Sequence, residues 1–457
     1  MTGIWVQIIQ FLLSLSLLIV LHEGGHFFFA KLFKTRVEKF YLFFDFLFPF
    51  SNILPFSIFK KKKGDTTYGI GWFPLGGYVK IAGMVDESMD KEQLAKPPEP
   101  WEFRSKKAWQ RLLIMLGGII VNVVLAFFIY SAILFTWGQQ QLPMSELSNG
   151  VVITDSLGYN LGFQDGDKIL AVNNEPVVYF NDLMPKMLNA KTVQIERKGK
   201  DTTLVMPVNF AGQVIDNKGQ SLFSLPFPAI VGKVVSGSGA DIAGLKKADK
   251  IIAINGIKTP GFVTVKNTVE SEKGKNIQLS VIRDGQPLSL QAHVSDTGTL
   301  GFMFALPQTP EEMAKMGGYH FETQHFNFFQ AFPAGIRMGI EKMGSYIDQF
   351  KLILNPKTGA YKGLGGFISI GKIYPQTWNW QHFWEVTAFL SLILAVMNLL
   401  PIPGLDGGYV LFTLIEMITG RKVNEKVLEV ATTIGLILLA VLMIYANGMD
   451  IFRLFKS

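Results

Sequence analysis

The chain has 457 residues, of which 49% are hydrophobic, and it carries a net charge of +7 and no cysteine. A mean hydropathy of +0.28 is too apolar for an ordinary soluble enzyme and indicates several membrane spans joined to soluble parts. The lack of cysteine excludes disulfides and thiolate metal sites. Because the lysines cluster beside apolar segments, the positive charge indicates membrane topology rather than nucleic-acid binding.

Four apolar segments approach the roughly 20 residues that a membrane-spanning helix needs. They are Ile4–Leu21, Leu112–Trp137, Val386–Leu400 and Val430–Tyr445. The first has no basic residue before it and leads directly into a polar motif, so we interpret it as a retained span rather than a signal peptide. The loops after the first span, before the second and between the last two are rich in Lys and Arg. These loops are therefore predicted to face the cytoplasm, with both chain ends on the other side.

The first span ends in His22-Glu23-Gly24-Gly25-His26, the H-E-x-x-H pattern of zinc proteases. Residues four apart share one helix face, so His22 and His26 can bind one metal ion together. Glu23 then lies beside the metal, where it can take a proton from a bound water. His22 is roughly 27 Å along the span at ~1.5 Å per residue, near the cytoplasmic face. The alternative interpretation is a pair of polar residues that cap a membrane helix.

Between the first two spans the sequence predicts membrane-associated β structure. Phe40–Phe59 is aromatic and broken by prolines, and we interpret it as an interfacial or re-entrant segment. Thr66–Met84 alternates β-formers with glycines and predicts a hairpin. A free edge of this hairpin could hold an unwound substrate by strand addition, or the hairpin could be purely structural. Its candidate substrate-binding residues are Gly69, Gly71, Gly76 and Gly77.

The second span contains Gly117, Gly118 and Asn122. Small residues permit a close approach of helices, and an asparagine can form hydrogen bonds across a helix pair. Helix packing is therefore the favoured interpretation of the two glycines, while the sequence leaves the role of Asn122 open.

The section after the second span contains an internal repeat. Leu161–Asn174 aligns with Ala243–Gly256, and Arg197–Lys200 aligns with Arg283–Gln286 in a strand–turn–strand context. The sequence therefore predicts two copies of a small, mostly β unit, over residues 139–224 and 225–309.

The two copies resemble PDZ domains, whose A-G-L-x-x-G-D-x-I-x-x-I-N-G stretch they echo, and the second copy has Ala248 where that family has glycine. A PDZ groove binds a chain end or a strand by β-addition. The resemblance makes Leu161, Gly162 and Phe163 candidates for the loop that holds a carboxylate. Alternatively, the pair only spaces or shields the membrane part. Further on, Phe326–Leu354 has helical apolar spacing and predicts an amphipathic helix on the outer membrane face.

The third span ends in Asn398-Leu399-Leu400-Pro401-Ile402-Pro403-Gly404-Leu405-Asp406. Because this span runs inward, Asp406 arrives near the depth of the two histidines, and we predict that it is the third metal ligand that a catalytic zinc site requires. Capping of the next helix is its alternative role. Pro401 and Pro403 cannot continue a regular helix, so the break leaves room beside the metal and makes both prolines candidate substrate-binding residues.

With both motifs present, the chain resembles the site-2 protease family of intramembrane zinc metalloproteases over nearly its whole length. Its order of elements resembles the bacterial branch that regulates sigma-E. The resemblance implies one Zn²⁺ per chain, bound by His22, His26 and Asp406, with Glu23 as the catalytic base. It also implies that Asn398 holds substrate backbone near the metal and that residues 66–84 form a membrane re-entrant β-loop.

Two further motifs of that family are incomplete in this chain. Gly118–Asn122 resembles G-P-x-x-N without its proline, and Gly366–Ile370 resembles G-P-x-S-I with Phe367 in the proline position. Neither departure touches the predicted metal ligands, so they affect only the details of substrate gating that the resemblance implies.

The predicted fold is a multi-pass α-helical membrane protein, with four transmembrane helices, a membrane-re-entrant β-hairpin and two mostly-β PDZ-like extracytoplasmic domains. The predicted parts are a first helix (1–30), a cytoplasmic or re-entrant region (31–111), a second helix (112–138), two PDZ-like domains (139–224 and 225–309), an amphipathic helix and linker (310–384), a third helix (385–406), a cytoplasmic link (407–429) and a fourth helix with the C-terminus (430–457).

The predicted function is hydrolysis of a peptide bond within or near the transmembrane segment of single-pass membrane proteins, in the bacterial inner membrane. The site would lie near the cytoplasmic face, and the resemblance suggests anti-sigma factors or leftover signal peptides as substrates, with periplasmic PDZ units as a size filter. A membrane-anchored PDZ scaffold with a non-catalytic metal is one rival, which Glu23 argues against. A zinc transporter is another, against which the polar cluster lies at one face only.

Overall fold

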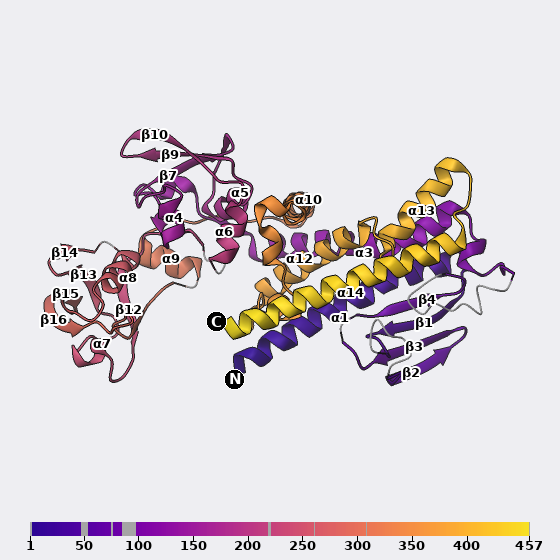
Figure 1. Ribbon diagram of the computed structural model, residues 1–457, viewed down its shortest axis with the longest axis horizontal. Helices are drawn as coiled ribbons and strands as arrows, with labels where there is room; N and C mark the ends of the chain where they lie inside the picture. Colours follow the sequence, from indigo (N-terminus) through magenta and orange to yellow (C-terminus); the bar gives the residue numbers. More distant parts are fainter. Residues whose placement is uncertain are drawn as a thin grey trace. The chain divides into compact units, whose positions relative to one another are not determined.

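The computed structural model of the chain describes residues 2–46, 54–74, 76–84, 97–217, 221–259, 261–307 and 309–456. The chain divides into two compact units (Figure 1). The first, which holds the long helices, comprises Met1–Gly138, His325–Ile347 and Leu364–Ser457. The second, which is mostly β, comprises Gln139–Gln324 and Asp348–Gly363.

Long apolar helices dominate the first unit. Its helical elements are α1 (Thr2–Leu32), η1 (Phe103–Ser105), α3 (Ala108–Trp137), α10 (Phe328–Leu354, as far as Ile347), α11 (Phe367–Gly371), α12 (Trp380–Leu399), α13 (Asp406–Thr419) and α14 (Glu425–Lys456). Among the described residues, four helices are long and apolar enough to cross a membrane, namely α1, α3, α12 and α14. Each of them overlaps one of the four predicted spans.

The sequence predicts a cytoplasmic link over residues 407–429, but the structure has the helix α13 over Asp406–Thr419. It has 14 residues, or about 21 Å at 1.5 Å per residue, which is too short to cross a bilayer. Its buried residues Tyr409 and Val410 pack in one apolar cluster with Ile114 and Met115 of α3. The apolar run after Asp406 therefore forms a helix because it has a neighbouring helix to pack against.

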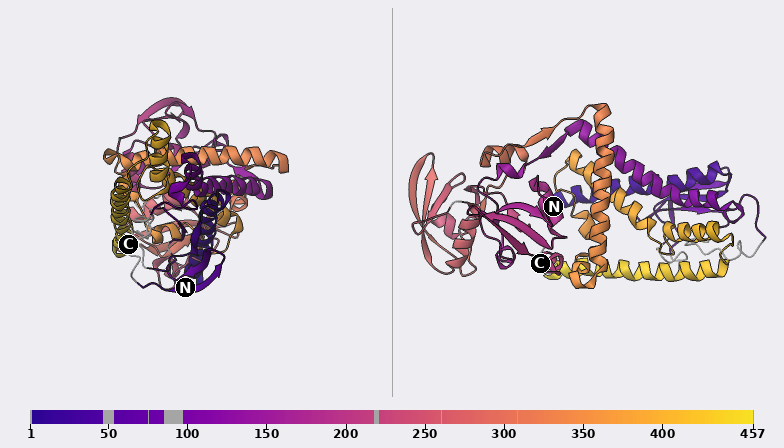
Figure 2. Two further views of the ribbon diagram at one scale, coloured as in Figure 1. Left: turned by 90° about the vertical axis from the view of Figure 1, so that its right-hand side faces the viewer. Right: turned by 90° about the horizontal axis from the view of Figure 1, so that it is seen from above.

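A four-stranded sheet lies at one end of the long helices, and both chain ends lie at the other (Figures 1 and 2). Its strands are β1 (Val37–Leu42), β2 (Ser57–Lys63), β3 (Thr66–Gly71) and β4 (Tyr78–Ile81), in the order β2-β3-β1-β4. The segment interpreted as interfacial, Phe40–Phe59, thus supplies parts of β1 and β2, while residues 47–53 with Pro49 lie outside the described residues.

The predicted hairpin over Thr66–Met84 is wrong in its pairing. Its two strands, β3 and β4, are separated by β1, which pairs with β3 in parallel and with β4 antiparallel. The tight turn lies instead between β2 and β3, where Gly64 has a φ of +61°. Alternation and glycines predict that strands exist, but they do not say which strands are neighbours.

The second unit contains two mostly-β parts of the same chain, each with its own apolar core, which we call the first and the second β subunit. The first contains β5 (Gln139–Gln141), η2 (Met144–Glu146), β6 (Val152–Ile153), α4 (Ser156–Asn160), β7 (Lys168–Val172), β8 (Glu175–Pro176), η3 (Phe180–Asp182), α5 (Leu183–Met187), β9 (Thr192–Arg197), β10 (Lys200–Val205), α6 (Phe210–Asp216) and β11 (Phe223–Ser224). Its main sheet has the order β10-β9-β7-β8.

The second subunit contains β12 (Ala229–Val234), α7 (Gly239–Ile242), β13 (Lys250–Ile254), β14 (Ile257–Lys258), α8 (Phe262–Ser271), β15 (Asn276–Arg283), β16 (Gln286–His293) and β17 (Phe302–Phe304). Its sheet has the order β16-β15-β13-β12-β17, with β14 paired to β13. The remaining elements of the unit are α9 (Pro310–Gly317), β18 (Glu322–Gln324), η4 (Pro356–Thr358) and η5 (Ala360–Gly363).

The sequence repeat corresponds to one arrangement that occurs in both β subunits. In the second, Arg283 at the end of β15 binds the buried Asp249 at 2.7 Å and donates to the Gly244 carbonyl at 2.7 Å. In the first, Arg197 binds Asp167 and the Gly162 carbonyl at the same distances. Each arginine therefore ties a hairpin to the loop that precedes the strand of the repeated motif.

Replacing Arg283 by Ala is expected to destabilise the second β subunit by about 3 kcal/mol, because it leaves the Asp249 carboxylate buried without its partner. Hydrogen–deuterium exchange of β13 and β15 in the full-length protein measures this. Lys275→Ala, which removes an exposed ion pair to Glu272 in the same subunit, should change the exchange little. Equal exchange in both variants would show that the buried pair does not stabilise the subunit.

The pair of Arg283 and Asp249 also makes the stability of the second β subunit depend on pH. Burial acts to raise the pKa of Asp249, but hydrogen bonds from Arg283 and Lys246 outweigh it and hold that pKa below its ordinary value. A carboxyl with a lowered pKa in the folded state contributes stability above about pH 4, and this stability is lost as the pH falls through the lowered pKa. Arg283→Ala should therefore make the subunit less sensitive to acid.

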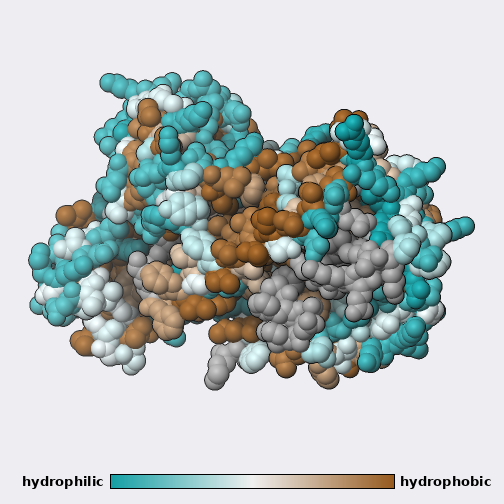
Figure 3. Space-filling view, turned by 45° about the vertical axis from the view of Figure 1, so that its right-hand side comes forward, coloured by the Kyte–Doolittle hydropathy of each residue, from teal (hydrophilic) through white to brown (hydrophobic). Residues whose placement is uncertain are grey.

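The surface of the first unit is apolar over its long helices. On the face shown in Figure 3, hydrophobic side chains gather over the long helices, whereas hydrophilic side chains cover most of the visible surface of the β subunits. On α14, five exposed apolar residues that carry this character are Val430, Ile434, Ile437, Leu438 and Val441. Such a surface is expected where lipid rather than water surrounds the helices.

Candidate active site

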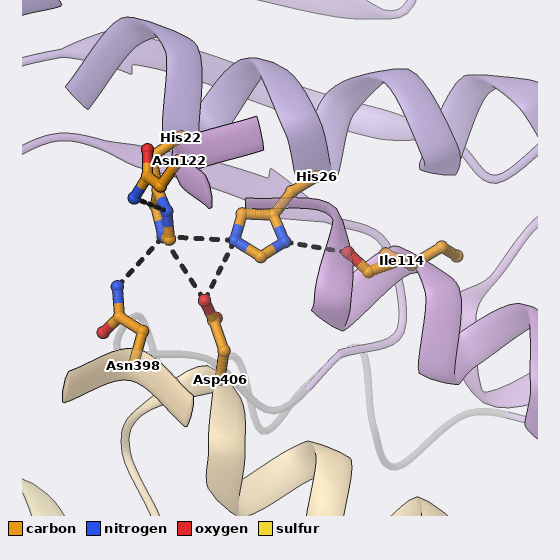
Figure 4. A network of polar contacts seen from close by, with 6 residues as sticks. All are labelled: His22, His26, Ile114, Asn122, Asn398 and Asp406. Carbon is orange, nitrogen blue, oxygen red and sulfur yellow. Dashed lines mark hydrogen bonds and ion pairs between the residues drawn. The ribbon is translucent and has the colours of Figure 1, made fainter. Parts of the chain in front are cut away.

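Three side chains from two distant parts of the chain converge inside the first unit (Figure 4). His22 and His26 lie one turn apart on α1, and Asp406 is the first residue of α13. The Nε2 atoms of the two histidines are 3.4 Å apart, and Asp406 Oδ2 lies 3.3 Å from His22 Nε2 and 3.2 Å from His26 Nε2. Both histidines are buried.

This donor set fits a tetrahedral zinc ion. Ligand atoms about 2.05 Å from a tetrahedral metal are separated by about 3.3 Å, and the three observed separations agree with that value. Asp406 Oδ2 is buried and has no hydrogen-bond partner among the described residues, although two nitrogens lie near it. Two imidazole nitrogens and a carboxylate oxygen that face one point are suited to a shared cation, and among the described residues they form the one such cluster.

The helix α3 supports both imidazoles from behind. His26 Nδ1 is 2.8 Å from the carbonyl oxygen of Ile114, and His22 Nδ1 is 3.0 Å from Asn122 Nδ2. A carbonyl oxygen only accepts hydrogen bonds, so His26 carries its proton on Nδ1 and leaves Nε2 free to bind a metal.

Two glycine contacts let α3 come this close to α1. A Cβ atom on Gly25 would collide with the backbone of Gly117, so the two helices touch there through their main chains. A Cβ on Gly118 would lie 2.5 Å from His26 Nε2 and 2.6 Å from His22 Cε1. The predicted packing role of the second-span glycines therefore extends to making room for the histidine rings.

Gly25→Ala is expected to push α3 away from α1 and to lower bound zinc at least tenfold, because the contact it breaks is between rigid backbones. Gly24→Ala is the matched control, since a Cβ on Gly24 meets no atom within 4 Å. Zinc content of the two purified variants, measured by elemental analysis, checks the prediction. Full zinc in Gly25→Ala would mean that the helices can separate without disturbing the site.

The position of Asp406 depends on contacts that hold α13 in place. Arg111 Nη2 of α3 and Glu416 Oε1 of α13 form an ion pair at 2.5 Å, with both side chains largely buried. Just before α13, the backbone of Pro403 lies against Gly435 of α14, and a Cβ atom on Gly435 would collide with it. The break between α12 and α13 is therefore fixed on both sides.

A cavity of about 260 Å³ adjoins the three ligands. Glu23 lines it beside His22 and His26, and the backbone N–H of Val79 on β4 faces the Glu23 carboxylate. Among the described strands β4 pairs only with β1, and the Val79 contact places β4 beside Glu23. Further lining residues include Gly76, Gly77, Asn398 and Tyr409.

The cavity separates the predicted substrate-binding residues into two groups. Asn398, Gly76 and Gly77 line it, and Asn398 Nδ2 lies 3.3 Å from His22 Nε2. Residues that do not line it are Gly69, Gly71, Pro401 and Pro403. The first two of these sit within the sheet, where Cβ atoms would collide with the ring of Tyr41 and the backbone of Phe44.

The predicted carboxylate loop of the first β subunit has its N–H groups already in use. Gly162 N–H donates to the Tyr159 carbonyl and Phe163 N–H to the Gly158 carbonyl. The side chain of Phe163 is 1% exposed, and Leu161 is partly buried against the same apolar core. This geometry favours a structural role for these residues over ligand binding.

The sequence pattern assigns no role to several residues of this site. Asn122 belongs to a motif that does not indicate its partner, and no pattern marks Tyr409 of α13 or Thr432 of α14, although both line the cavity. The Ile114 carbonyl is a backbone group, which no residue pattern marks. Only the spacing of Gly118 and Asn122, one helical turn apart, carried a signal.

The whole chain is similar to known proteins. The profile of peptidase family M50 matches residues 10–442. The chain is 30% identical to a putative zinc metalloprotease of Vibrio cholerae, over 99% of this chain and 100% of that protein. It is 27% identical to Protease RseP of Yersinia pestis (99% and 100% covered) and 26% identical to the regulator of sigma E protease of Haemophilus influenzae (97% and 98% covered). The predicted enzyme class, a zinc metalloendopeptidase, is confirmed by this family, and the chain belongs to peptidase family M50.

Proposed function

We propose that this zinc metalloendopeptidase cleaves single-pass membrane proteins within or near their transmembrane segment. The observation that carries the proposal is the convergence of His22, His26 and Asp406 beside a cavity that Glu23 and a free strand edge line. This cluster is formed by residues of the apolar helix α1 and the break after α12, so a substrate must reach it from the membrane region.

The proposed residue roles follow from the atoms that face one another. His22 Nε2, His26 Nε2 and Asp406 Oδ2 would hold one Zn²⁺, which when bound lowers the pKa of a water to roughly 7 and polarises the scissile carbonyl. Glu23 would take the proton of the attacking water and pass it to the leaving amine nitrogen as the C–N bond breaks. Asn398, which lines the same cavity, would hold the substrate backbone.

A transmembrane helix hides its carbonyls in internal hydrogen bonds, so the substrate must unwind before cleavage. We propose that the unwound segment pairs with the outer edge of β4, as an added strand. The N–H of Val79 already faces the Glu23 carboxylate, so a strand on this edge would pass the catalytic base. The sheet β2-β3-β1-β4 would thus act as the membrane re-entrant loop, with β4 rather than a two-stranded hairpin presenting the edge.

We further propose an inner-membrane location, with the β sheet on the cytoplasmic side and the two β subunits outside. The basic loops and the shared end of both chain termini support this orientation. The β subunits would be PDZ-like size filters that exclude untrimmed substrates. The name of the Haemophilus relative, a regulator of sigma E protease, supports anti-sigma factors as substrates, and signal-peptide remnants share their single-span form.

Cleavage of tagged single-span proteins by the purified enzyme in detergent tests this proposal. Two substrates should be compared that differ only in their span, one with helix-weakening Gly and Pro residues and one made of Leu and Ala. We expect cleavage of the first, much slower cleavage of the second, and loss of both when a chelator removes zinc. Cleavage only of soluble unfolded peptides would refute a membrane substrate, and no cleavage by zinc-loaded enzyme would favour the alternative of a membrane-anchored PDZ scaffold.

A further inference from the structure

Asn122 is the most completely buried polar side chain in contact with the metal-ligand candidates. Its exposure is 0%, and it lies at the centre of α3, facing α1. Its Nδ2 is 3.0 Å from His22 Nδ1, while its Oδ1 is buried and has no hydrogen-bond partner among the described residues. Burying an amide oxygen without a hydrogen bond is unfavourable, so the orientation of this amide needs a physical reason.

The explanation lies in which nitrogen of His22 carries the proton. As drawn in Figure 4, Asn122 Nδ2 donates to His22 Nδ1, which then must be unprotonated. In that neutral tautomer the proton sits on Nε2, the atom that faces His26 and Asp406. A protonated Nε2 has no lone pair to give to a metal, so this tautomer is unsuited to the role proposed for His22.

A rotation of the Asn122 amide by 180° exchanges its nitrogen and oxygen atoms without moving the backbone. Oδ1 then accepts a hydrogen bond from His22 Nδ1–H, and Nε2 is left free for the metal. The rotation leaves Nδ2 unpaired instead of Oδ1, so the position of the proton on His22 decides between the two orientations. His26 already has the equivalent arrangement, because the Ile114 carbonyl accepts from its Nδ1.

We propose that Asn122 is a positioning residue for zinc, whose side-chain oxygen holds His22 in the tautomer that binds the metal. This inference rests on the proposed zinc site and extends it to a residue of α3. Metal-bound histidines generally donate their second nitrogen to such a partner, and loss of the partner typically lowers metal affinity 10–100-fold. The proposal also relates Gly118 to Asn122 on α3. Gly118 makes room for the two histidine rings, and Asn122 orients the ring of His22.

Zinc affinity of the full-length protein, measured by competition with a chelator, tests the proposal without using cleavage as its readout. Asn122→Leu keeps the size but accepts no hydrogen bond, and we expect a 10–100-fold weaker affinity. Asn122→Asp can only accept, and we expect affinity equal to or above that of the original chain. The visible absorption of bound Co²⁺ should likewise change in Asn122→Leu and stay similar in Asn122→Asp.

Ser391→Ala is the matched control. Ser391 Oγ donates to the backbone carbonyl of Asn122 at 2.8 Å, so its removal disturbs the same contact between α3 and α12 but leaves the amide beside His22. It should keep the affinity of the original chain. Unchanged affinity in Asn122→Leu would overturn the proposal, as would equal losses in the Leu and Asp variants, which would make the amide a donor. Failure of the original chain to bind zinc would instead overturn the proposed metal site.

Discussion

Replacing Asp406 by Ala is expected to lower zinc affinity by more than about 100-fold and to abolish cleavage with it. The carboxylate is one of three groups that converge on the site, and the two histidines alone leave a divalent cation with too few ligands and no negative charge. The expected loss exceeds the 10–100-fold that partners outside the ligand shell contribute. Chelator competition and a cleavage assay on the same preparation measure both effects.

The control for this variant is Thr413→Val, a substitution of similar volume at a buried position of the same helix. It should retain zinc and activity, because it leaves the start of α13 unchanged. If Asp406→Ala bound zinc as tightly as the original chain, the third ligand would have to be another residue, and the position of Asp406 beside the two histidines in Figure 4 would not reflect zinc binding.

Gly118→Ala is expected to weaken zinc binding by steric collision with the two histidine rings. The added Cβ would stand 2.5 Å from His26 Nε2 and 2.6 Å from His22 Cε1, well inside van der Waals contact. Both rings are held from behind by α3 and cannot move without losing their partners. We therefore expect at least a tenfold loss of zinc affinity and a corresponding loss of cleavage, measured on protein that still elutes as the original chain does.

Gly448→Ala serves as the comparison for this variant. Gly448 also lies within a membrane-type helix, α14, but a Cβ there meets no atom within 4 Å. This substitution should leave zinc affinity unchanged and could slightly favour the helix, because alanine is the better helix former. A Gly118→Ala protein with normal zinc affinity would show that the rings can shift without cost.

The candidate metal ligands could be predicted because their signals are local or depend only on depth. The four-residue spacing of His22 and His26 fixes a shared helix face, and the direction of the third span brings Asp406 to the same level. Family membership supports this interpretation. The structure adds separations between these atoms that suit a tetrahedral metal.

The sheet and the supporting contacts could not be predicted in the same way. The insertion of β1 between β3 and β4 is a long-range pairing, and nothing in the glycine pattern of residues 66–84 encodes it. The helix α13 forms where a link was expected, since its apolar residues find a partner in α3. The support of His26 by the Ile114 carbonyl involves a main-chain atom, which carries no sequence signature.

We propose that Glu23 is the base of a zinc-dependent cleavage, and the variant Glu23→Gln tests this role. A tagged single-span substrate is incubated with the purified original chain and with Glu23→Gln, after both have been shown to hold equal zinc. We predict that cleavage falls by about 10²–10⁴-fold in the variant, the usual contribution of a general base, while zinc stays bound. Equal cleavage by the two proteins would rule out Glu23 as the base and point to a contaminating protease.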